Sequence, residues 1–213
     1  MALKIMCISD THCRHRSLEL DLEGVDCIIH SGDFSSGSEA STIDFLLWYS
    51  ELDVKHKILI AGNHDWFAYN YQEEFKRKCE LLDIIYLEDS ECVIDGVVFY
   101  GTPWVNKFYN WAFMYHEEDL IKKYKKISKG VHVLISHGPA HGTLDVVLRA
   151  GAGSVGSTSL RDHLPKLKRL KAHIFGHIHE SAGIVQHQHY VSVNASILDA
   201  NYRVHNQPII IEV

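Results

Sequence analysis

Short apolar runs that end in polar residues recur along the chain and predict its main strands. Five such runs cover residues 4–8, 27–29, 58–60, 131–135 and 172–175. Each is bounded by a turn signal, which is typical of strands buried on both faces of a parallel or mixed sheet. The residues after each run are rich in Asp, Asn, His and Gly. Because open α/β sheets bind ligands beyond the carboxyl ends of their strands, we expect these polar clusters to form one shared site.

Helical patterns separate the strands of the N-terminal half. We expect helices near 38–52 and 71–81, which gives the strand–helix alternation of βαβ units. In the middle of the chain, Asp95-Gly96 is a two-residue hairpin signal between two short strands. The other expected elements are strands at 84–87, 91–94, 97–100, 188–194 and 208–213 and helices at 116–128 and 158–168. No repeat or long linker divides the chain, so we interpret residues 1–213 as one domain.

The composition is that of an ordinary soluble globular protein. Of 213 residues, 46% are hydrophobic and 23% are charged, and the formal net charge is −6. This acidic balance disfavours duplex nucleic acid as a partner, because proteins that bind it carry basic surfaces. There is no apolar stretch of membrane-spanning length and no signal-peptide pattern, so we expect no membrane partner and a cytoplasmic location. The five cysteines contain no Cys-x-x-Cys pair and fit reduced thiols.

Seven residues at the predicted strand ends can each offer a metal a carboxylate oxygen, an amide oxygen or an imidazole nitrogen. They are Asp10, His12, Asp33, Asn63, His137, His177 and His179. Each alone is also compatible with an ordinary turn or a structural hydrogen bond. A mononuclear site uses only three or four protein ligands, so seven convergent donors predict two metals that share a carboxylate. Imidazole and hard oxygen without thiolate favour Mn, Fe, Zn or Ni over Ca or Mg.

A glycine pattern in mid-chain matches a dinucleotide-binding motif but lacks its context. Gly151-Ala152-Gly153-Ser154-Val155-Gly156 has the form G-x-G-x-x-G, which requires an acidic residue about 20 positions later. That position falls in Phe175-Gly176-His177, where no acid stands at a strand end. We therefore interpret the segment as a flexible loop beside the site and not as a nicotinamide-binding site.

The order of the polar motifs resembles the signature of the calcineurin-like metallophosphoesterase superfamily. The motifs are Asp10-x-His12, Gly32-Asp33, Gly62-Asn63-His64-Asp65, His137-Gly138 and Gly176-His177-x-His179. Flanking stretches, among them Tyr100-Gly101-Thr102-Pro103-Trp104 and Asn194-Ala195-Ser196, are similar to the metallophosphoesterase-domain-containing (MPPED) phosphodiesterase family. Asp65 departs from that family, which usually has Glu there, and the 140–160 and 197–207 segments match poorly.

The resemblance implies a four-layer α/β/β/α sandwich of two mixed sheets flanked by helices, with a di-metal site at the carboxyl ends of the strands. It implies two divalent transition-metal ions, with manganese as the first candidate. One would be held by Asp10, His12, Asp33 and His179 and the other by Asp33, Asn63, His137 and His177, with Asp33 as the bridge. His64 would donate a proton to the leaving alkoxide as general acid. Asp65 would either orient that imidazole or cap a helix.

Three functions are compatible with this chemistry. The first is a phosphodiesterase that acts on a small phosphoester substrate, such as a small or cyclic nucleotide. A phosphomonoesterase or protein phosphatase would use the same metals, and a scaffold of the same fold would have lost catalysis. The presence of all seven donors and His64 argues against the scaffold. We expect Asn63 and Trp104 to contact the substrate, Trp104 by stacking on a base, and the aromatic residues Phe108, Tyr109, Trp111 and Phe113 to pack as core.

Overall fold

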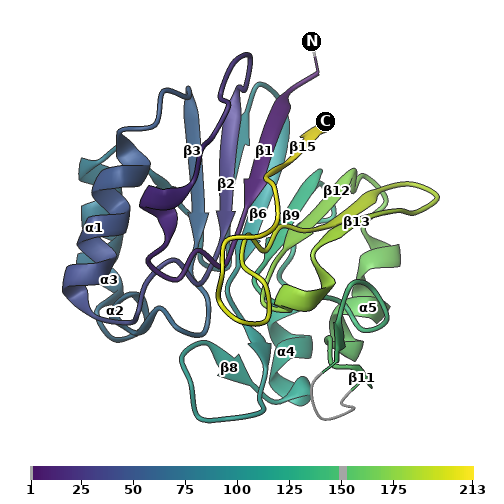
Figure 1. Ribbon diagram of the computed structural model, residues 1–213. Coiled ribbons are helices and arrows are strands. Elements are labelled where there is room, and N and C mark those ends of the chain that lie inside the picture. Colours follow the sequence, from purple (N-terminus) through teal and green to yellow (C-terminus); the bar gives the residue numbers. More distant parts are fainter. Residues whose placement is uncertain (1, 149–152) are drawn as a thin grey trace.

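Two mixed β-sheets lie face to face at the centre of the protein (Figure 1). The structure is a computed structural model that describes residues 2–148 and 153–213. The first sheet has the strand order β15-β1-β2-β3-β4. Its parallel strands are β1 (Lys4–Ile8), β2 (Cys27–Ser31), β3 (His56–Ile60) and β4 (Ile85–Tyr86). The last strand of the chain, β15 (Ile209–Glu212), pairs antiparallel with β1. The N-terminal βαβ units expected from the sequence are therefore present.

The second sheet has the order β13-β14-β12-β9-β6-β5. Its four inner strands are parallel and are β6 (Val97–Thr102), β9 (Val133–Ser136), β12 (Ala172–Phe175) and β14 (Val191–Asn194). The antiparallel edge strands are β5 (Ser90–Ile94) and β13 (Gly183–Gln186). Asp95 and Gly96, which join β5 to β6, have φ angles of 48° and 80°. Two successive residues with positive φ are the signature of the tight hairpin turn that the sequence predicts here.

Each inner strand is buried on both faces, because one face meets the other sheet and the opposite face meets helices. In β1, Ile5 and Cys7 belong to the core between the sheets, whereas Met6 packs in the core that includes the helices. In β9, Val133 and Leu134 divide in the same way. This double burial explains why these strands appear in the sequence as continuous apolar runs.

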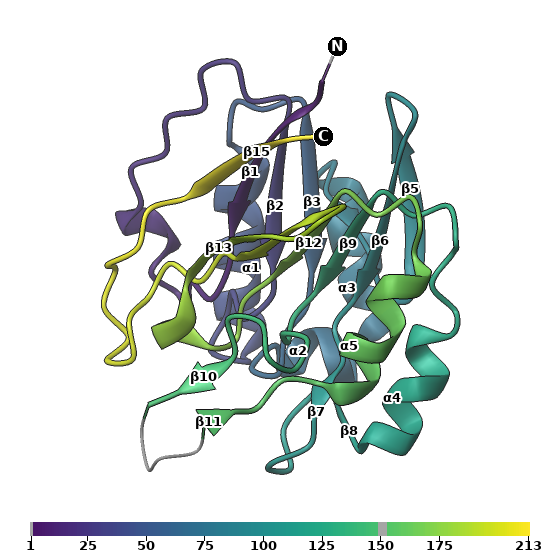
Figure 2. The ribbon, with the colours of Figure 1, turned by 90° about the vertical axis from the view of Figure 1, so that its right-hand side faces the viewer.

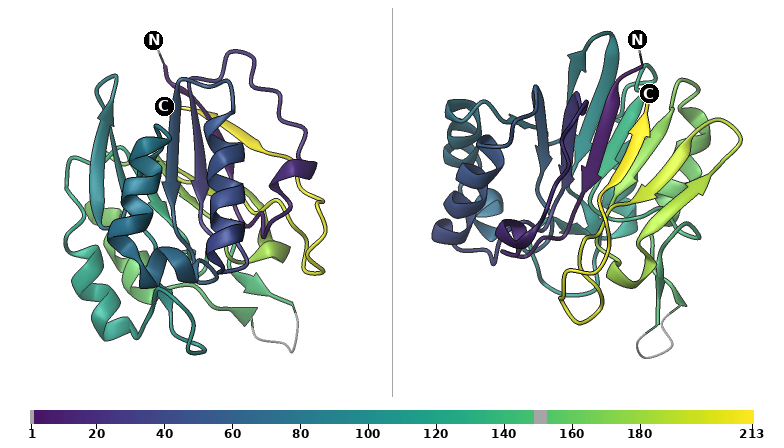
Figure 3. Two further views of the ribbon diagram at one scale, coloured as in Figure 1. Left: turned by 90° about the vertical axis from the view of Figure 1, so that its left-hand side faces the viewer. Right: turned by 45° about the horizontal axis from the view of Figure 1, so that its top comes forward.

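Helices cover the outer faces of both sheets and complete four layers, which confirms the expected sandwich (Figure 3). The first sheet is covered by α1 (Glu39–Ser50), α2 (Trp66–Asn70) and α3 (Gln72–Leu81). The second is covered by α4 (Glu117–Tyr124) and α5 (Thr158–His163), as Figure 2 shows. In the described part of the chain, no helix combines the length and apolarity needed to cross a bilayer.

Two short strand pairs lie below the ends of the large sheets (Figure 2). One pairs β7 (Val105–Asn106) with β8 (Met114–Tyr115), and the other pairs β10 (Val146–Val147) with β11 (Gly153–Ser154). The glycine pattern interpreted as a flexible loop falls partly on residues 151 and 152, which lie outside the described residues. Its remaining residues form β11 and the approach to α5.

Helix α4 ends at Tyr124, four residues before the expected end at 128. The amides of Lys126 and Ile127 donate to carbonyls three residues earlier, at Lys123 and Tyr124. Such bonds tighten the last turn and end the helix. Ile127 is thereby buried in the core, so packing rather than intrinsic helix propensity sets this boundary.

Candidate metal centre

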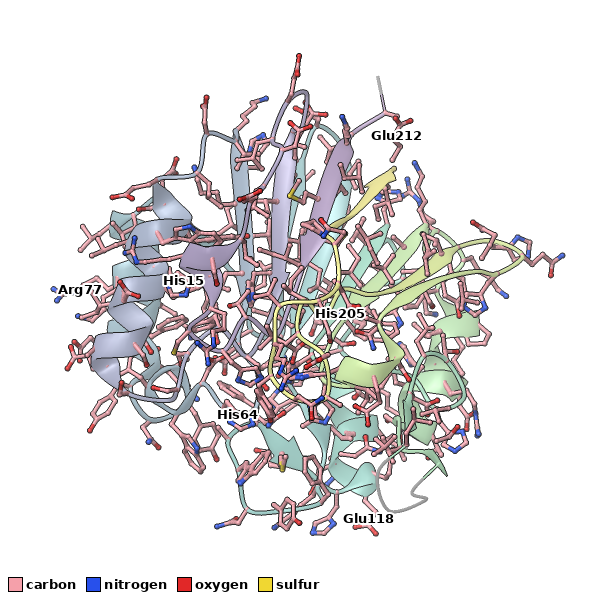
Figure 4. The ribbon with its side chains drawn as sticks, viewed as in Figure 1. His15, His64, Arg77, Glu118, His205 and Glu212 are labelled. Atoms are coloured by element: carbon pink, nitrogen blue, oxygen red, sulfur yellow. The ribbon has the colours of Figure 1, made fainter. Side chains whose placement is uncertain are left out.

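All seven expected donors lie together where the strands of both sheets end. Asp10 and Asp33 follow β1 and β2, Asn63 follows β3, and His137 and His177 follow β9 and β12. A parallel bridge between Ser9 and Ser196 links the two sheets at this edge. Figure 4 shows His64 below the end of the first sheet, whereas His15 lies beside the helices.

The donor atoms form three overlapping groups, each with all its ligand atoms within 4.8 Å of one another. The groups are Asp10 with His12 and His179, His12 with Asp33 and His64, and Asp33 with His137 and His177. Asn63 joins the third group, since its Oδ1 lies 3.1 Å from Nε2 of His137. The first group contains three of the four ligands expected for one metal, without Asp33, and the third group together with Asn63 contains all four expected for the other. The second shows that His64 is also within reach of a metal.

Asp33 lies between the two halves of the cluster. Its Oδ2 is 3.7 Å from Nε2 of His12 and 3.2 Å from Nε2 of His137. Its Oδ1 accepts a hydrogen bond of 2.8 Å from the backbone N–H of His64. One carboxylate oxygen is therefore anchored, and the other faces imidazoles of both halves. This geometry suits a carboxylate that bridges two metals.

The two carboxylate oxygens of Asp10 also have different surroundings: one is held by hydrogen bonds, and the other faces the cluster. Its Oδ2 accepts from the backbone N–H of His177 (2.8 Å) and from Oγ of Ser196 (2.9 Å). Its Oδ1 is buried, has no hydrogen-bond partner among the described residues, and lies 3.4 Å from Nε2 of His179. Gly176 permits this approach, because a Cβ there would overlap Oδ2 of Asp10.

Two histidines are oriented by bonds from the far side of their rings. Nδ1 of His137 bonds the carbonyl of Ser31 at 2.9 Å, and Nδ1 of His179 bonds that of Asp199 at 3.1 Å. Since a carbonyl only accepts, each Nδ1 carries the proton, and the neutral ring presents a lone pair on Nε2 to the cluster. Lone pairs on Nε2 of His137 and Oδ2 of Asp33 then face each other and repel unless a cation lies among them. The residues present thus fit a metal site.

Without a metal, His137 is protonated, and the positive charge of its ring replaces the charge of the cation. Burial lowers the pKa of His137, but the charges of Asp33 and Asp10 outweigh it and raise this pKa to about 9. Burial would raise the pKa of Asp33, but the charge and hydrogen bond of His137 hold it well below its usual value. For His12, burial outweighs the carboxylates and lowers the pKa to about 4. The carboxylates are therefore ionised and His12 is neutral, as metal ligands must be.

Four of the donors adopt left-handed backbone conformations, which are uncommon for residues other than glycine. The φ angles are 54° at Asp10, 38° at His12, 58° at Asp33 and 71° at His177. Such conformations persist only where the surrounding structure enforces them, and they gather at functional sites. Here the enforcement includes backbone bonds from His12 to Asp33 and from Asp10 to Gly32, both 3.0 Å long.

Asp65 ties together the loops that follow β2 and β3. Its Oδ2 accepts from the backbone N–H groups of Asp33 (2.9 Å) and Gly62 (2.8 Å), and its Oδ1 accepts from the N–H and Oγ of Ser35. It stands at the start of α2 but makes no capping bond. Both expected roles, orienting His64 and capping a helix, are therefore wrong. Burial and the charge of Asp33 raise its pKa to about 7.

His30 joins the loops after β1 and β2 from inside the core, a role that its place within an apolar strand did not indicate. Its Nδ1 accepts from the backbone N–H of Gly32 at 3.3 Å, so its Nε2 donates to Oγ1 of Thr11 at 3.0 Å. Thr11 stands between the donors Asp10 and His12. The burial of His30 lowers its pKa to about 3, so the ring is neutral and links the two loops through these hydrogen bonds.

Trp104 is packed in the core, which is incompatible with the base-stacking role expected for it. It is 5% exposed, its ring stacks on Tyr115 at 4.5 Å, and its Nε1 donates to Asp89 at 3.0 Å. Lys123 covers the ring, with Nζ 3.8 Å from the centroid. The pairing of β7 with β8 sets this orientation, and such a two-residue pair has no clear sequence signal.

Three of the four aromatic residues expected in the core instead line the cleft at the donors. Phe108, Tyr109 and Trp111 are 51%, 64% and 37% exposed and border this cleft, whereas Phe113 is buried as expected. The Trp111 ring lies 4.5 Å from that of His64. Tyr202, which the sequence did not single out, lies 5.0 Å from the rings of both His12 and His179.

A profile of the calcineurin-like phosphoesterase family matches residues 3–181. The chain belongs to this family. It is 34% identical over 233 aligned residues to human Metallophosphoesterase domain-containing protein 1, covering 99% of this chain and 71% of that protein. The family implies phosphoester hydrolase activity, and its members typically bind two divalent metals.

Solved structures show the same fold. One aligns over 100% of this chain and 99% of its own, with a TM-score of 0.70 and 15% identity. A dimetal phosphatase from Danio rerio aligns over 90% of this chain and 86% of its own, with a TM-score of 0.53 and 13% identity. At these identities the likeness concerns the architecture of this phosphoesterase and not its substrate.

Replacing Asp33 with Asn should weaken metal binding at both halves of the cluster, because the amide removes the charge and the shared oxygen. We expect the affinity for Mn²⁺ to fall at least about 100-fold. This loss is larger than is typical when the mutated residue contacts a metal ligand but not the metal itself. Metal titration by calorimetry, with metal content by mass spectrometry, measures the loss. Asp95→Asn is the control, since Asp95 is an exposed carboxylate at the β5–β6 turn. Two metals bound with normal affinity to Asp33→Asn would exclude the bridge.

Metal binding should release at least one proton near pH 7. His137, with a pKa of about 9, is protonated at pH 7 in the metal-free protein and must lose that proton to coordinate. The apparent affinity should therefore fall with decreasing pH, about tenfold per unit for each proton released. Calorimetry in buffers of different ionisation enthalpy counts the protons. His116→Asn, at an exposed position, should behave as wild type, and a pH-independent affinity between pH 6 and 8 would contradict the expectation.

Proposed function

We propose that this protein is a metal-dependent phosphodiesterase that acts on a small phosphodiester, with small or cyclic nucleotides as the first candidates. The cleft at the donors has a volume of about 470 Å³. Among its described lining residues there is no Lys or Arg. A diester carries one negative charge, whereas a monoester carries up to two and is usually bound with additional cationic donors. The charge of the cleft therefore supports a diester.

The donor set supports two divalent transition metals, with manganese as the first candidate. One would be held by Asp10, His12, Asp33 and His179, and the other by Asp33, Asn63, His137 and His177. When bound, such metals supply Lewis acidity toward water and the phosphate oxygens. The chain itself contributes the orientation of the ligands. Nδ2 of Asn63 is buried without a hydrogen-bond partner among the described residues, which supports donation to a phosphate oxygen.

We assign the proton for the leaving group to His64. Its backbone N–H is fixed by Asp33, and its half-buried ring lies 4.9 Å from that of His12 and 4.5 Å from that of Trp111. This places the imidazole on the border between the donors and the aromatic wall. A leaving alkoxide needs a proton, which a general acid at this border can supply.

We also propose the cytoplasm as the compartment. All five cysteines are free, and Cys7, Cys27 and Cys79 are buried. Reduced cysteines of this kind are typical of a reducing compartment.

A comparison of two chromogenic substrates tests the proposed reaction. With the Mn²⁺-loaded protein, we expect kcat/KM for bis(p-nitrophenyl) phosphate to exceed that for p-nitrophenyl phosphate at least about tenfold, a difference of about 1.4 kcal/mol in transition-state binding. Asp33→Asn gives the background rate. A preference for the monoester would assign the protein as a monoesterase, and no hydrolysis of either ester by fully metal-loaded protein would assign it as a scaffold.

His64→Ala should separate proton donation from metal binding. We expect normal metal content and a rate loss of about 10²–10⁴-fold on alkyl esters, with little loss on p-nitrophenyl esters, whose leaving group needs no proton. A series of leaving groups of increasing pKa measures the difference, with His116→Asn as control. An equal loss across the series would exclude the general acid, and a loss of metal would make His64 a ligand instead.

A further inference from the structure

A second cleft, of about 540 Å³, lies beside the metal cluster. It shares five lining residues with the first cleft, namely Phe108, Tyr109, Val147, His177 and Ile178. His177 is one of the seven donors, so the second cleft begins next to the candidate metal site. Its volume lies within the usual range for small-molecule sites, about 300–1,000 Å³. A molecule held at the cluster can therefore extend into it.

The chemistry of the second cleft differs from that of the first. Its walls are formed by aliphatic groups, among them Pro139 and Val155, and by the rings of Phe108 and Tyr109. Lys107 is the one charged residue (Lys, Arg, Asp or Glu) among the lining residues that the structure describes, and it is exposed. The first cleft, in contrast, contains Asp33 and Glu180 besides the imidazoles. The second cleft thus suits an uncharged, apolar group, and its two rings favour an aromatic one.

The walls of the second cleft are connected by hydrogen bonds across three segments of the chain. Nδ2 of Asn106, in β7, donates to the carbonyl of Val155 at 3.4 Å. The backbone N–H of Ser157 donates to the carbonyl of Pro139 at 2.9 Å. Gly156 donates through its backbone N–H to Asp145 at 2.9 Å. These bonds hold the cleft open in advance, which lowers the entropic cost of binding.

We propose that the second cleft binds an aromatic ester group of the phosphodiester whose phosphate lies at the metal cluster. This inference rests on the proposed function and narrows it to diesters with at least one aromatic substituent. Such a group gains by burial against the apolar walls. A charged substituent would lose its hydration there without an opposite charge among the described walls, apart from the exposed Lys107.

Two phosphinates test the proposal, because their P–C bonds resist hydrolysis and each carries the single charge of a diester. We expect the Mn²⁺-loaded protein to bind methyl(phenyl)phosphinate at least about tenfold more tightly than dimethylphosphinate, as measured by calorimetry. Val155→Phe narrows the second cleft and should bring the ratio of the two Kd values close to one. Val93→Phe, at an exposed position on β5, is the matched control and should keep the wild-type ratio.

Equal affinities for the two phosphinates in the wild-type protein would overturn the inference. A wild-type ratio in Val155→Phe with normal metal content would also overturn it, because the aromatic group would then bind elsewhere. If Val155→Phe does not fold, Val147→Phe narrows the cleft from β10, the strand that pairs with β11. Failure to hydrolyse any phosphoester would contradict the proposed function, whereas hydrolysis of diesters with a phosphinate ratio of one would contradict this inference alone.

Discussion

The burial of three carboxylates at one edge of the sheets is the constraint on which the site depends. Asp10, Asp33 and Asp65 are almost completely inaccessible to solvent, and buried charges are costly unless they are hydrogen-bonded and paired. Each therefore accepts a hydrogen bond from a backbone N–H group of another loop, namely from His177, His64 and Asp33, respectively. These bonds fix the loops relative to one another, so the energetic requirement of burial also sets the positions of the candidate metal ligands.

The layers and the donors could be predicted from the sequence because both leave local signals. A strand buried on both faces gives an apolar run, and a donor at its end follows that run directly, as Asp33 follows β2. The packing of loops leaves no such signal. Left-handed φ angles at Asp10 and His177 and the bonds of Asp65 arise from contacts between segments distant in sequence. Strand β13 and the short α2 were missed because each is stabilised by its neighbours rather than by its own pattern.

The aromatic residues also show that the packing of loops cannot be predicted from the sequence. Trp104 and Trp111 stand in one aromatic-rich stretch, and composition cannot decide which ring is buried. Which of the two rings is buried depends on β7 and β8, because their pairing stacks Trp104 on Tyr115 and leaves Trp111 beside His64. The register of a two-residue strand pair thus determines which side chains can meet a substrate.

If the protein acts on a phosphodiester as proposed, the polarity of the clefts implies a strict order of binding. The described walls of the first cleft contain no Lys or Arg, while Asp33 and Glu180 contribute negative charge. In an acidic protein, a phosphate would be repelled from such a cleft until divalent cations reverse its potential. Apolar burial in the second cleft cannot offset that repulsion at the cluster, because it acts on the ester group and not on the phosphate. For the proposed phosphodiesterase, metal loading would therefore be required for substrate binding as well as for chemistry, and the second cleft would select only among molecules that the metals have already attracted.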